Sequence, residues 1–146
     1  METPARRPRI TLWLLRAVVT VHLVAVLGQP VWAGLFLTGD VDAIAVHGTV
    51  GSLLAAWGLL TAGVALAYVV GGRGPLWVVP LAVAHFLATG FQIGAGYGRD
   101  LGLHIPLGVG LVVVAVVLAA WVWSPAAARS RRAPAAPAPR TPVGAR

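Results

Sequence analysis

Long apolar stretches dominate the sequence, and polar residues are confined to the short segments between them. The four stretches occupy residues 10–37, 43–70, 75–96 and 101–123. Each has at least the roughly 20 residues that a helix needs to cross the hydrocarbon core of a bilayer. The pattern predicts four membrane-spanning helices.

The segments between these stretches are only a few residues long. They read "TGDVD" (38–42), "GGRG" (71–74) and "YGRD" (97–100). Short loops join antiparallel neighbours, so the expected fold is all-α, a transmembrane four-helix bundle with up-down-up-down topology. In that topology the first and third spans are diagonal to each other, as are the second and fourth.

Three residues at the loop ends are expected to start helices. Asp42 and Asp100 each stand just before an apolar stretch, where a carboxylate accepts hydrogen bonds from the free N–H groups of the first helical turn. Pro75 fits the first position of the third span, because that position needs no N–H donor.

Both ends of the chain differ in composition from the 10–123 membrane domain. Residues 1–9 form a short basic arm, which we expect on the cytoplasmic side. Residues 124–146 are rich in proline, alanine and arginine and have almost no large apolar side chain. Such a segment cannot bury enough apolar surface to fold, so we expect a disordered cytoplasmic tail.

The composition excludes a soluble domain and several kinds of cofactor site. Hydrophobic residues make up 58% of the chain and charged residues only 10%, against the roughly 25% charged residues of soluble domains. Cysteine is absent. Disulfides, thiolate metal sites, iron–sulfur clusters and covalently attached c-type haem are therefore excluded.

The net charge of +7 comes from arginines that lie almost entirely on one side of the predicted bundle. Of the eleven arginines, only Arg99 falls on the opposite side. The positive-inside rule then places both termini in the cytoplasm of a multi-pass protein in the cell membrane. The basic character is a topology signal, so we expect the lipid bilayer and not nucleic acid as the partner of this chain.

The first apolar stretch has a second interpretation. Arginines, an apolar run and "VWA" at 31–33 resemble a signal peptide with a small-residue cleavage site. The run is longer than the roughly 7–15 residues usual for such a region. We therefore expect a retained span, although the sequence alone leaves cleavage open.

Each predicted span contains one histidine, and the four fall into an internal repeat of two hairpins. In the first half His22 is followed by Gln29 and then by His47 in "HGTVG"; in the second half His85 is followed by Gln92 and then by His104 in "HIPLG". The motif H-x6-Q followed by H-x3-G thus occurs twice. Parallel repeats in a membrane are related by an axis along the membrane normal.

This repeat is expected to bring the histidines together in two diagonal pairs. His47 would face His104 near the outer surface, and His22 would face His85 deeper in the membrane. Gly51 and Gly108 lie one helical turn from the outer pair, on the same face, and open space in the bundle core.

Two facing imidazoles beside glycines suit a flat cofactor that needs two axial nitrogen ligands. Haem b has these requirements, and bundle cores hold such cofactors. We therefore expect one haem on the outer pair and consider a second on the deeper pair. Histidines, as titratable groups inside a membrane, indicate function by default, but polar side chains also hydrogen-bond neighbouring helices without any cofactor.

Three further polar residues have two interpretations each. Gln29 and Gln92 fit structural hydrogen-bonders, or groups that bond a haem propionate or the free N–H of a ligating ring. Arg99 lies beside the outer pair in sequence and fits either a solvated loop charge or a partner for a propionate.

Two segments resemble the halves of a four-helix haem unit. "GQPVWAGLFLTGDVDAIAVHGTVG" (28–51) and "FQIGAGYGRDLGLHIPLG" (91–108) are similar to the unit repeated in the haem A synthase family, and the resemblance covers about residues 10–123. It implies that His47 and His104 hold the outer haem. A histidine in every span is also similar to the cytochrome b561 core, in which two haems lie between diagonal helices.

The resemblance has departures that bear on activity. The chain is one unit long, and Ile44, Ala45, Val46 and Gly48 surround His47 where the haem A synthase family has a glutamate before the histidine and an arginine after it. We therefore expect an electron carrier or accessory subunit more than an enzyme. Its partner would be a redox protein or a quinone. The alternative is a non-redox small subunit or a proton-linked transporter that uses the histidines as titratable sites.

Overall fold

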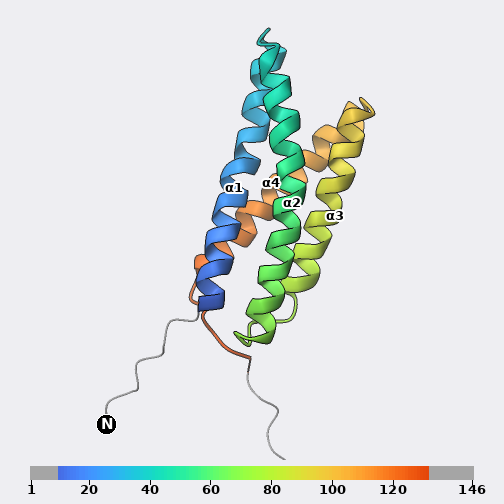
Figure 1. Ribbon diagram of the computed structural model, residues 1–146. Coiled ribbons are helices and arrows are strands. Elements are labelled where there is room, and N and C mark those ends of the chain that lie inside the picture. Colours follow the sequence, from blue (N-terminus) through green and yellow to red (C-terminus); the bar gives the residue numbers. More distant parts are fainter. Residues whose placement is uncertain (1–9, 132–146) are drawn as a thin grey trace, which may run out of the picture.

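The computed structural model describes residues 10–131 and has four helices, as the apolar pattern predicts (Figure 1). They are α1 (Ile10–Leu37), α2 (Asp42–Val70), α3 (Val78–Tyr97) and α4 (Leu101–Trp123). The basic arm and the tail from residue 132 onward lie outside the described residues.

The helices pack as adjacent hairpins around a square. The contacting pairs are α1·α2, α2·α3, α3·α4 and α1·α4, and the diagonal pairs α1·α3 and α2·α4 have no close backbone approach. The predicted diagonal relationships are thus confirmed. We call the end with the α1–α2 and α3–α4 loops the aspartate end, and the end with the α2–α3 loop the arginine end.

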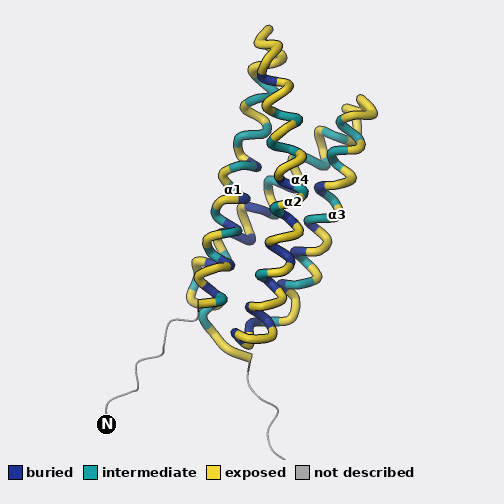
Figure 2. Tube along the Cα trace, viewed as in Figure 1, coloured by how far each residue is buried: buried dark blue, intermediate teal, exposed yellow. Residues whose placement is uncertain are grey.

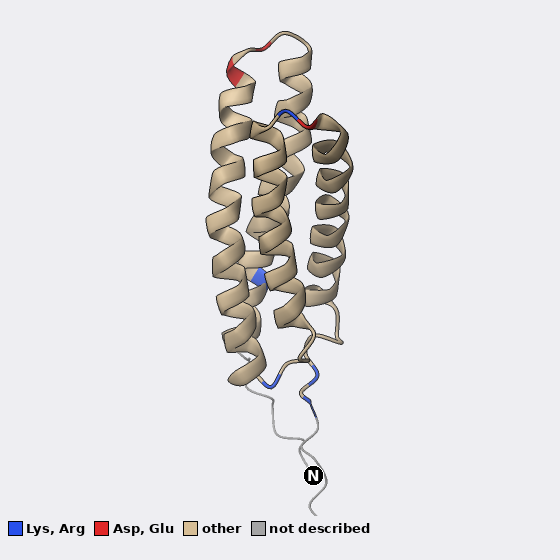
Figure 3. Cartoon of the chain, turned by 90° about the vertical axis from the view of Figure 1, so that its right-hand side faces the viewer, with Lys and Arg blue, Asp and Glu red and all other residues tan. Residues whose placement is uncertain are grey.

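Each helix is long and apolar enough to span a membrane. Most charges of the described residues lie at the two ends of the bundle, with the aspartates at one end and most arginines at or near the other (Figure 3). Large apolar side chains such as Leu53, Leu59 and Val117 are about 60% exposed along the helix surfaces. A multi-pass membrane protein meets these conditions, because lipid covers the apolar surface that water would not tolerate.

One charged residue, Arg16, lies within a span and is accommodated by its neighbours near the arginine end. Its Nε donates a hydrogen bond to the Val122 carbonyl of α4 at 2.9 Å. Its guanidinium also lies over the rings of Trp13 and Trp123, at 4.8 and 4.9 Å from their centroids. These contacts attach α1 to α4 and compensate a cation that lipid alone would not solvate.

The core is much denser toward the arginine end than toward the aspartate end. The large side chains that are fully buried, Leu15, Tyr68, Val78 and Val122, all belong to the arginine-end core. A smaller cluster of Val26, Leu54 and Ala115 lies farther along the bundle. Near the aspartate end the two hairpins diverge and most residues are exposed or half-buried (Figures 1 and 2).

Two of the three predicted helix starts differ from the structure. Asp100 caps α4, since its side chain accepts from the Leu103 N–H at 3.1 Å. Asp42 is instead the first residue of α2, and Asp40 provides the carboxylate that accepts from the N–H groups of Asp42 and Ala43 at 3.2 and 3.3 Å. The aspartate two residues earlier is the one whose side chain reaches the free amides.

The start of α3 also lies later than Pro75. Residues 75–77 form a turn closed by the Val78 N–H to the Pro75 carbonyl at 3.4 Å, and the helix begins at Val78. The preceding Gly74 packs directly on the Tyr68 ring, with no space for a Cβ atom. The chain must pass over this buried ring before a helix can begin.

The first part of the expected tail is folded onto the arginine end. Ala127 is fully buried, and its carbonyl accepts a hydrogen bond from the Tyr68 hydroxyl at 2.6 Å. Arg131 donates from Nη2 to the Val69 carbonyl at 3.1 Å. The expectation of disorder is therefore wrong for residues 124–131, because the carbonyls at the C-terminal end of α2 and the buried tyrosine provide partners that composition does not reveal.

We expect Tyr68→Phe to lower the stability of the fold. The change leaves the Ala127 carbonyl without its buried donor, which costs about 1 kcal/mol and lowers the midpoint of thermal unfolding in detergent micelles. Tyr97→Phe is the matched control, because Tyr97 is 75% exposed. Equal midpoints for the two variants would contradict the role given to this hydrogen bond.

Candidate functional site

The structure brings the four histidines together in the two predicted pairs. His47 of α2 and His104 of α4 form the aspartate-end pair, with ring centroids 6.0 Å apart and both residues half-buried. His22 of α1 and His85 of α3 form the mid-bundle pair, with centroids 5.0 Å apart and both residues buried. Each pair joins two diagonal helices across the bundle axis.

In the aspartate-end pair, both rings are held by the same hydrogen bond. His47 Nδ1 donates to the Gln29 carbonyl at 3.1 Å, and His104 Nδ1 donates to the Gln92 carbonyl at 2.9 Å. A carbonyl only accepts, so Nδ1 carries the proton and Nε2 of the neutral ring keeps its lone pair. Metal-binding histidines typically have this arrangement, in which one nitrogen is fixed by an acceptor and the other is left for the metal.

The glutamines of the repeat contact the pair through their backbones as well as through one side chain. Gln92 Nε2 donates to the His104 carbonyl at 2.8 Å, so α3 and α4 exchange two hydrogen bonds at this level. Gln92 Oε1 and Gln29 Nε2 are buried without a partner among the described residues. An acceptor and a donor therefore remain free beside the aspartate-end pair.

The two repeat glycines make room for these amides. A Cβ atom on Gly108 would lie 2.8 Å from Gln92 Nε2, whereas one on Gly51 would lie 3.7 Å from Gln29 Oε1. The glutamine side chains lie beside both glycines, so whether these positions open space for a guest stays a prediction. The two halves of the repeat therefore make equivalent hydrogen bonds to backbone carbonyls, but their glutamine side chains pack at different distances from the glycines.

Sequence reasoning missed Gly96 as part of this site. A Cβ atom there would lie 2.8 Å from Cε1 of the His104 ring, so the absence of a side chain lets the imidazole lie against α3. The sequence gives only an indirect signal, namely a glycine close before the short loop that leads to His104.

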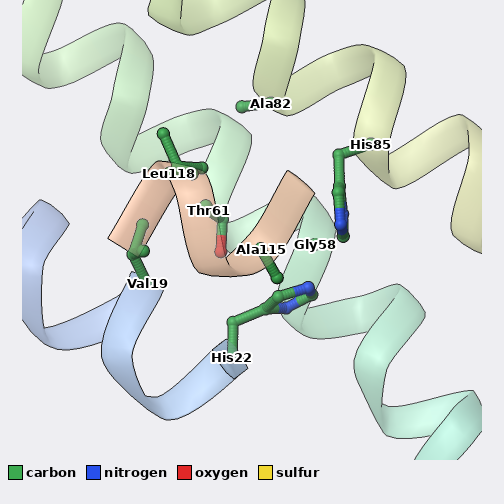
Figure 4. A pocket seen from close by; sticks show the side chains of 8 residues that line it. All are labelled: Val19, His22, Gly58, Thr61, Ala82, His85, Ala115 and Leu118. Carbon is green, nitrogen blue, oxygen red and sulfur yellow. The ribbon is translucent and has the colours of Figure 1, made fainter. Parts of the chain in front are cut away.

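The mid-bundle pair is held differently. His85 Nε2 donates to the Leu111 carbonyl of α4 at 3.2 Å, so the proton is on Nε2 and the lone pair on Nδ1. Both ring nitrogens of His22 are buried and have no partner among the described residues. A cavity of about 20 Å³ is lined by both residues and by Thr61 of α2 (Figure 4).

The separations of the rings distinguish what each pair is able to hold. With a metal–imidazole bond of about 2 Å and a ring radius of about 1 Å, centroids on opposite sides of one metal are roughly 6 Å apart. The 6.0 Å of the aspartate-end pair agrees with this arrangement. The 5.0 Å of the mid-bundle pair corresponds instead to an angle of roughly 110° at a shared metal, on the same bond lengths.

Arg99 is exposed in the α3–α4 turn, where its backbone has a positive φ of 58°. None of the hydrogen bonds or ion pairs of the described residues 10–131 involves its guanidinium. Both interpretations of Arg99, as a solvated loop charge and as a partner for a propionate, stay open.

The comparisons with known proteins leave the family open. No protein-family model, curated protein or solved structure matches the chain. The resemblance to haem-binding four-helix units therefore stays a prediction.

The two glycines give a matched pair of variants. Gly108→Ala displaces the Gln92 amide from the His104 carbonyl and costs about 1 kcal/mol, the value of one hydrogen bond. Gly51→Ala meets ordinary van der Waals distances and is neutral or slightly stabilising, since alanine favours a helix more than glycine does. Thermal unfolding in detergent should rank Gly108→Ala below Gly51→Ala, and the reverse order would contradict the geometry.

Proposed function

We propose that this chain is a membrane haem protein that binds one haem b between His47 and His104 and transfers single electrons. The observation that carries the proposal is the shared hydrogen bond from each Nδ1 to a glutamine carbonyl. It leaves two Nε2 lone pairs on diagonal helices, at a ring separation that suits opposite faces of one iron.

The packing at this level also favours a flat guest. The hairpins diverge toward the aspartate end, and the large fully buried side chains lie at the other end (Figures 1 and 2). His47 and His104 are themselves only half-buried. A planar group between α2 and α4 would extend toward α1 and α3, which do not contact each other closely.

The unpartnered amides provide groups for the edge of such a guest. Gln29 Nε2 is a free donor beside His47, and it would bond a carboxylate of the porphyrin. The iron supplies the exchange of one electron between its two oxidation states, and the protein orients the ligands, keeps them in the correct tautomer and lowers the local dielectric constant.

The internal repeat and the resemblance support the same function. In both halves the glutamine of H-x6-Q accepts the same hydrogen bond from the following histidine, which agrees with a unit of two similar hairpins. We further propose that both termini are cytoplasmic and that the electron partner is a redox protein or a membrane quinone.

A second candidate function rests on the same hydrogen bonds. Three of the four histidines already bond a carbonyl of another helix, so the rings also suit purely structural links in a small non-redox subunit. A proton-linked transporter receives less support, because no aspartate or glutamate lies inside the described helices beyond the first residue of α2.

We expect the purified protein to be red, with a Soret band that shifts on reduction by dithionite. His47→Ala and His104→Ala each remove one axial ligand and should abolish the low-spin spectrum. Ser52→Ala is the control, because the exposed Ser52 hydroxyl bonds only the Gly48 carbonyl within its own helix. Colourless protein from cells supplied with haem would contradict the haem and favour the structural candidate.

The absence of cysteine allows the orientation to be tested with single cysteines. Thr38→Cys lies in the α1–α2 loop, and Ser130→Cys lies beyond α4 at the arginine end. With a membrane-impermeant maleimide on intact cells, we expect the first to react at once and the second only after permeabilisation. The opposite order would invert the proposed topology.

A further inference from the structure

The mid-bundle pair contains hydrogen-bonding groups that the proposed haem does not use. We propose that His22, His85 and Thr61 together hold one ordered water molecule in the cavity that they line, deep in the apolar part of the bundle (Figure 4). The inference does not depend on haem binding, because this water site shares no side chain with His47 and His104.

His22 is the residue of this cavity that most needs a hydrogen-bond partner. It is only 6% exposed, and neither ring nitrogen has a partner among residues 10–131. A buried polar group without a partner destabilises a fold, because it has lost its hydrogen bonds to water and gained none in return. The ring of His22 forms part of the cavity wall, so a polar guest in the cavity would lie beside it.

The groups around the cavity match the donors and lone pairs of a water molecule. His85 gives its N–H to the Leu111 carbonyl, which leaves Nδ1 as an acceptor. Thr61 donates its hydroxyl proton to the Trp57 carbonyl at 2.9 Å, so its oxygen is left only to accept. A neutral imidazole at His22 has one N–H to donate. A water that accepts from His22 and donates to His85 and Thr61 makes the roughly three hydrogen bonds usual for a buried water.

The size of the cavity also fits a single water. Its volume of about 20 Å³ exceeds the roughly 10–15 Å³ that one ordered water needs. The other lining residues are small or aliphatic, including Gly58, Ala82 and Ala115, and a guest as large as a second haem would have to displace them. Cavities that stay empty are apolar, whereas this one has polar side chains from three helices in its wall.

A water at this level connects all four helices. His22, Thr61 and His85 belong to α1, α2 and α3, and the His85 ring is itself bonded to the Leu111 carbonyl of α4. The diagonal helices α1 and α3 have no close backbone approach. The water therefore supplies a hydrogen-bonded link between them that direct contacts of the described residues do not.

The first test detects the water by nuclear magnetic resonance in the full-length protein, with isotope-labelled histidine and deuterated detergent. Any bound haem is kept reduced, because low-spin ferrous iron is diamagnetic. We expect the ring N–H of His22 to show a cross-peak with a long-lived bound water, and the variant His22→Gln identifies the signal. A His22 ring without any water cross-peak would overturn the proposal.

Two threonines provide a matched pair of variants. Thr61 and Thr89 are each 6% exposed, and each bonds the carbonyl four residues earlier in its own helix, at 2.9 and 2.8 Å. Of the two, only Thr61 lines the cavity. We expect Thr61→Val to abolish the water cross-peak and to lower the midpoint of thermal unfolding in detergent by several degrees more than Thr89→Val. Equal effects of the two variants would contradict a water held by Thr61.

Filling the cavity distinguishes a wet site from a dry one. Ala115→Val adds methyl groups at the cavity wall, which excludes the water and leaves His22 without a partner, so we expect a lower unfolding midpoint. The loss should shrink in the His22→Leu background, where no imidazole needs a partner. A higher midpoint, as for a dry apolar cavity that gains packing, or a loss undiminished in that background would overturn the site. Two haems per chain, falling to one when His22 is replaced, would overturn it as well.

Discussion

An imidazole inside an apolar bundle is costly unless its N–H has an acceptor, and backbone carbonyls of neighbouring helices provide one for three of the four histidines. Helix carbonyls are already used within their own helices, but each oxygen has a second lone pair. With this second lone pair, the carbonyl of Gln29 accepts from His47 and that of Gln92 accepts from His104. The carbonyl of Leu111 accepts from His85 in the same way. The choice of acceptor decides which ring nitrogen keeps its lone pair.

The two levels of the bundle differ because their acceptors differ. At the aspartate end a carbonyl accepts from Nδ1 of each ring, which leaves the Nε2 lone pair free. In the mid-bundle pair the Leu111 carbonyl accepts a hydrogen bond from Nε2 of His85, and His22 has no acceptor among the described residues. Residues of one type, repeated in one motif, thus reach two chemical states through the backbone geometry around them.

Much of this arrangement follows from the sequence, and the exceptions have physical reasons. Four helices, their diagonal relationships and the pairing of His47 with His104 follow from apolar length, loop length and the repeat. The capping by Asp40 does not follow from the sequence, because it depends on which carboxylate reaches the free amides. The late start of α3 does not follow either, because it depends on the buried Tyr68 ring. The folded segment 124–131 was also unpredictable, since its partners are carbonyls of a distant helix.

Composition alone could not separate the roles of the glycines. Gly51 and Gly108 occupy equal places in the repeat. A Cβ atom on Gly108 would come within 3 Å of the glutamine amide, and a Cβ atom on Gly51 would not. Gly96 shows the same limit, because its importance arises from the position of a ring on another helix.

The uneven packing of the bundle also bears on how the molecule assembles. At one end, hydrogen bonds of Arg16, Tyr68 and residues 124–131 join α1, α2 and α4, and the dense apolar core also includes α3. The aspartate end has few such contacts, so local opening there costs less free energy than global unfolding. We therefore expect the helices to separate first at the aspartate end, while the dense arginine end keeps the four-helix arrangement.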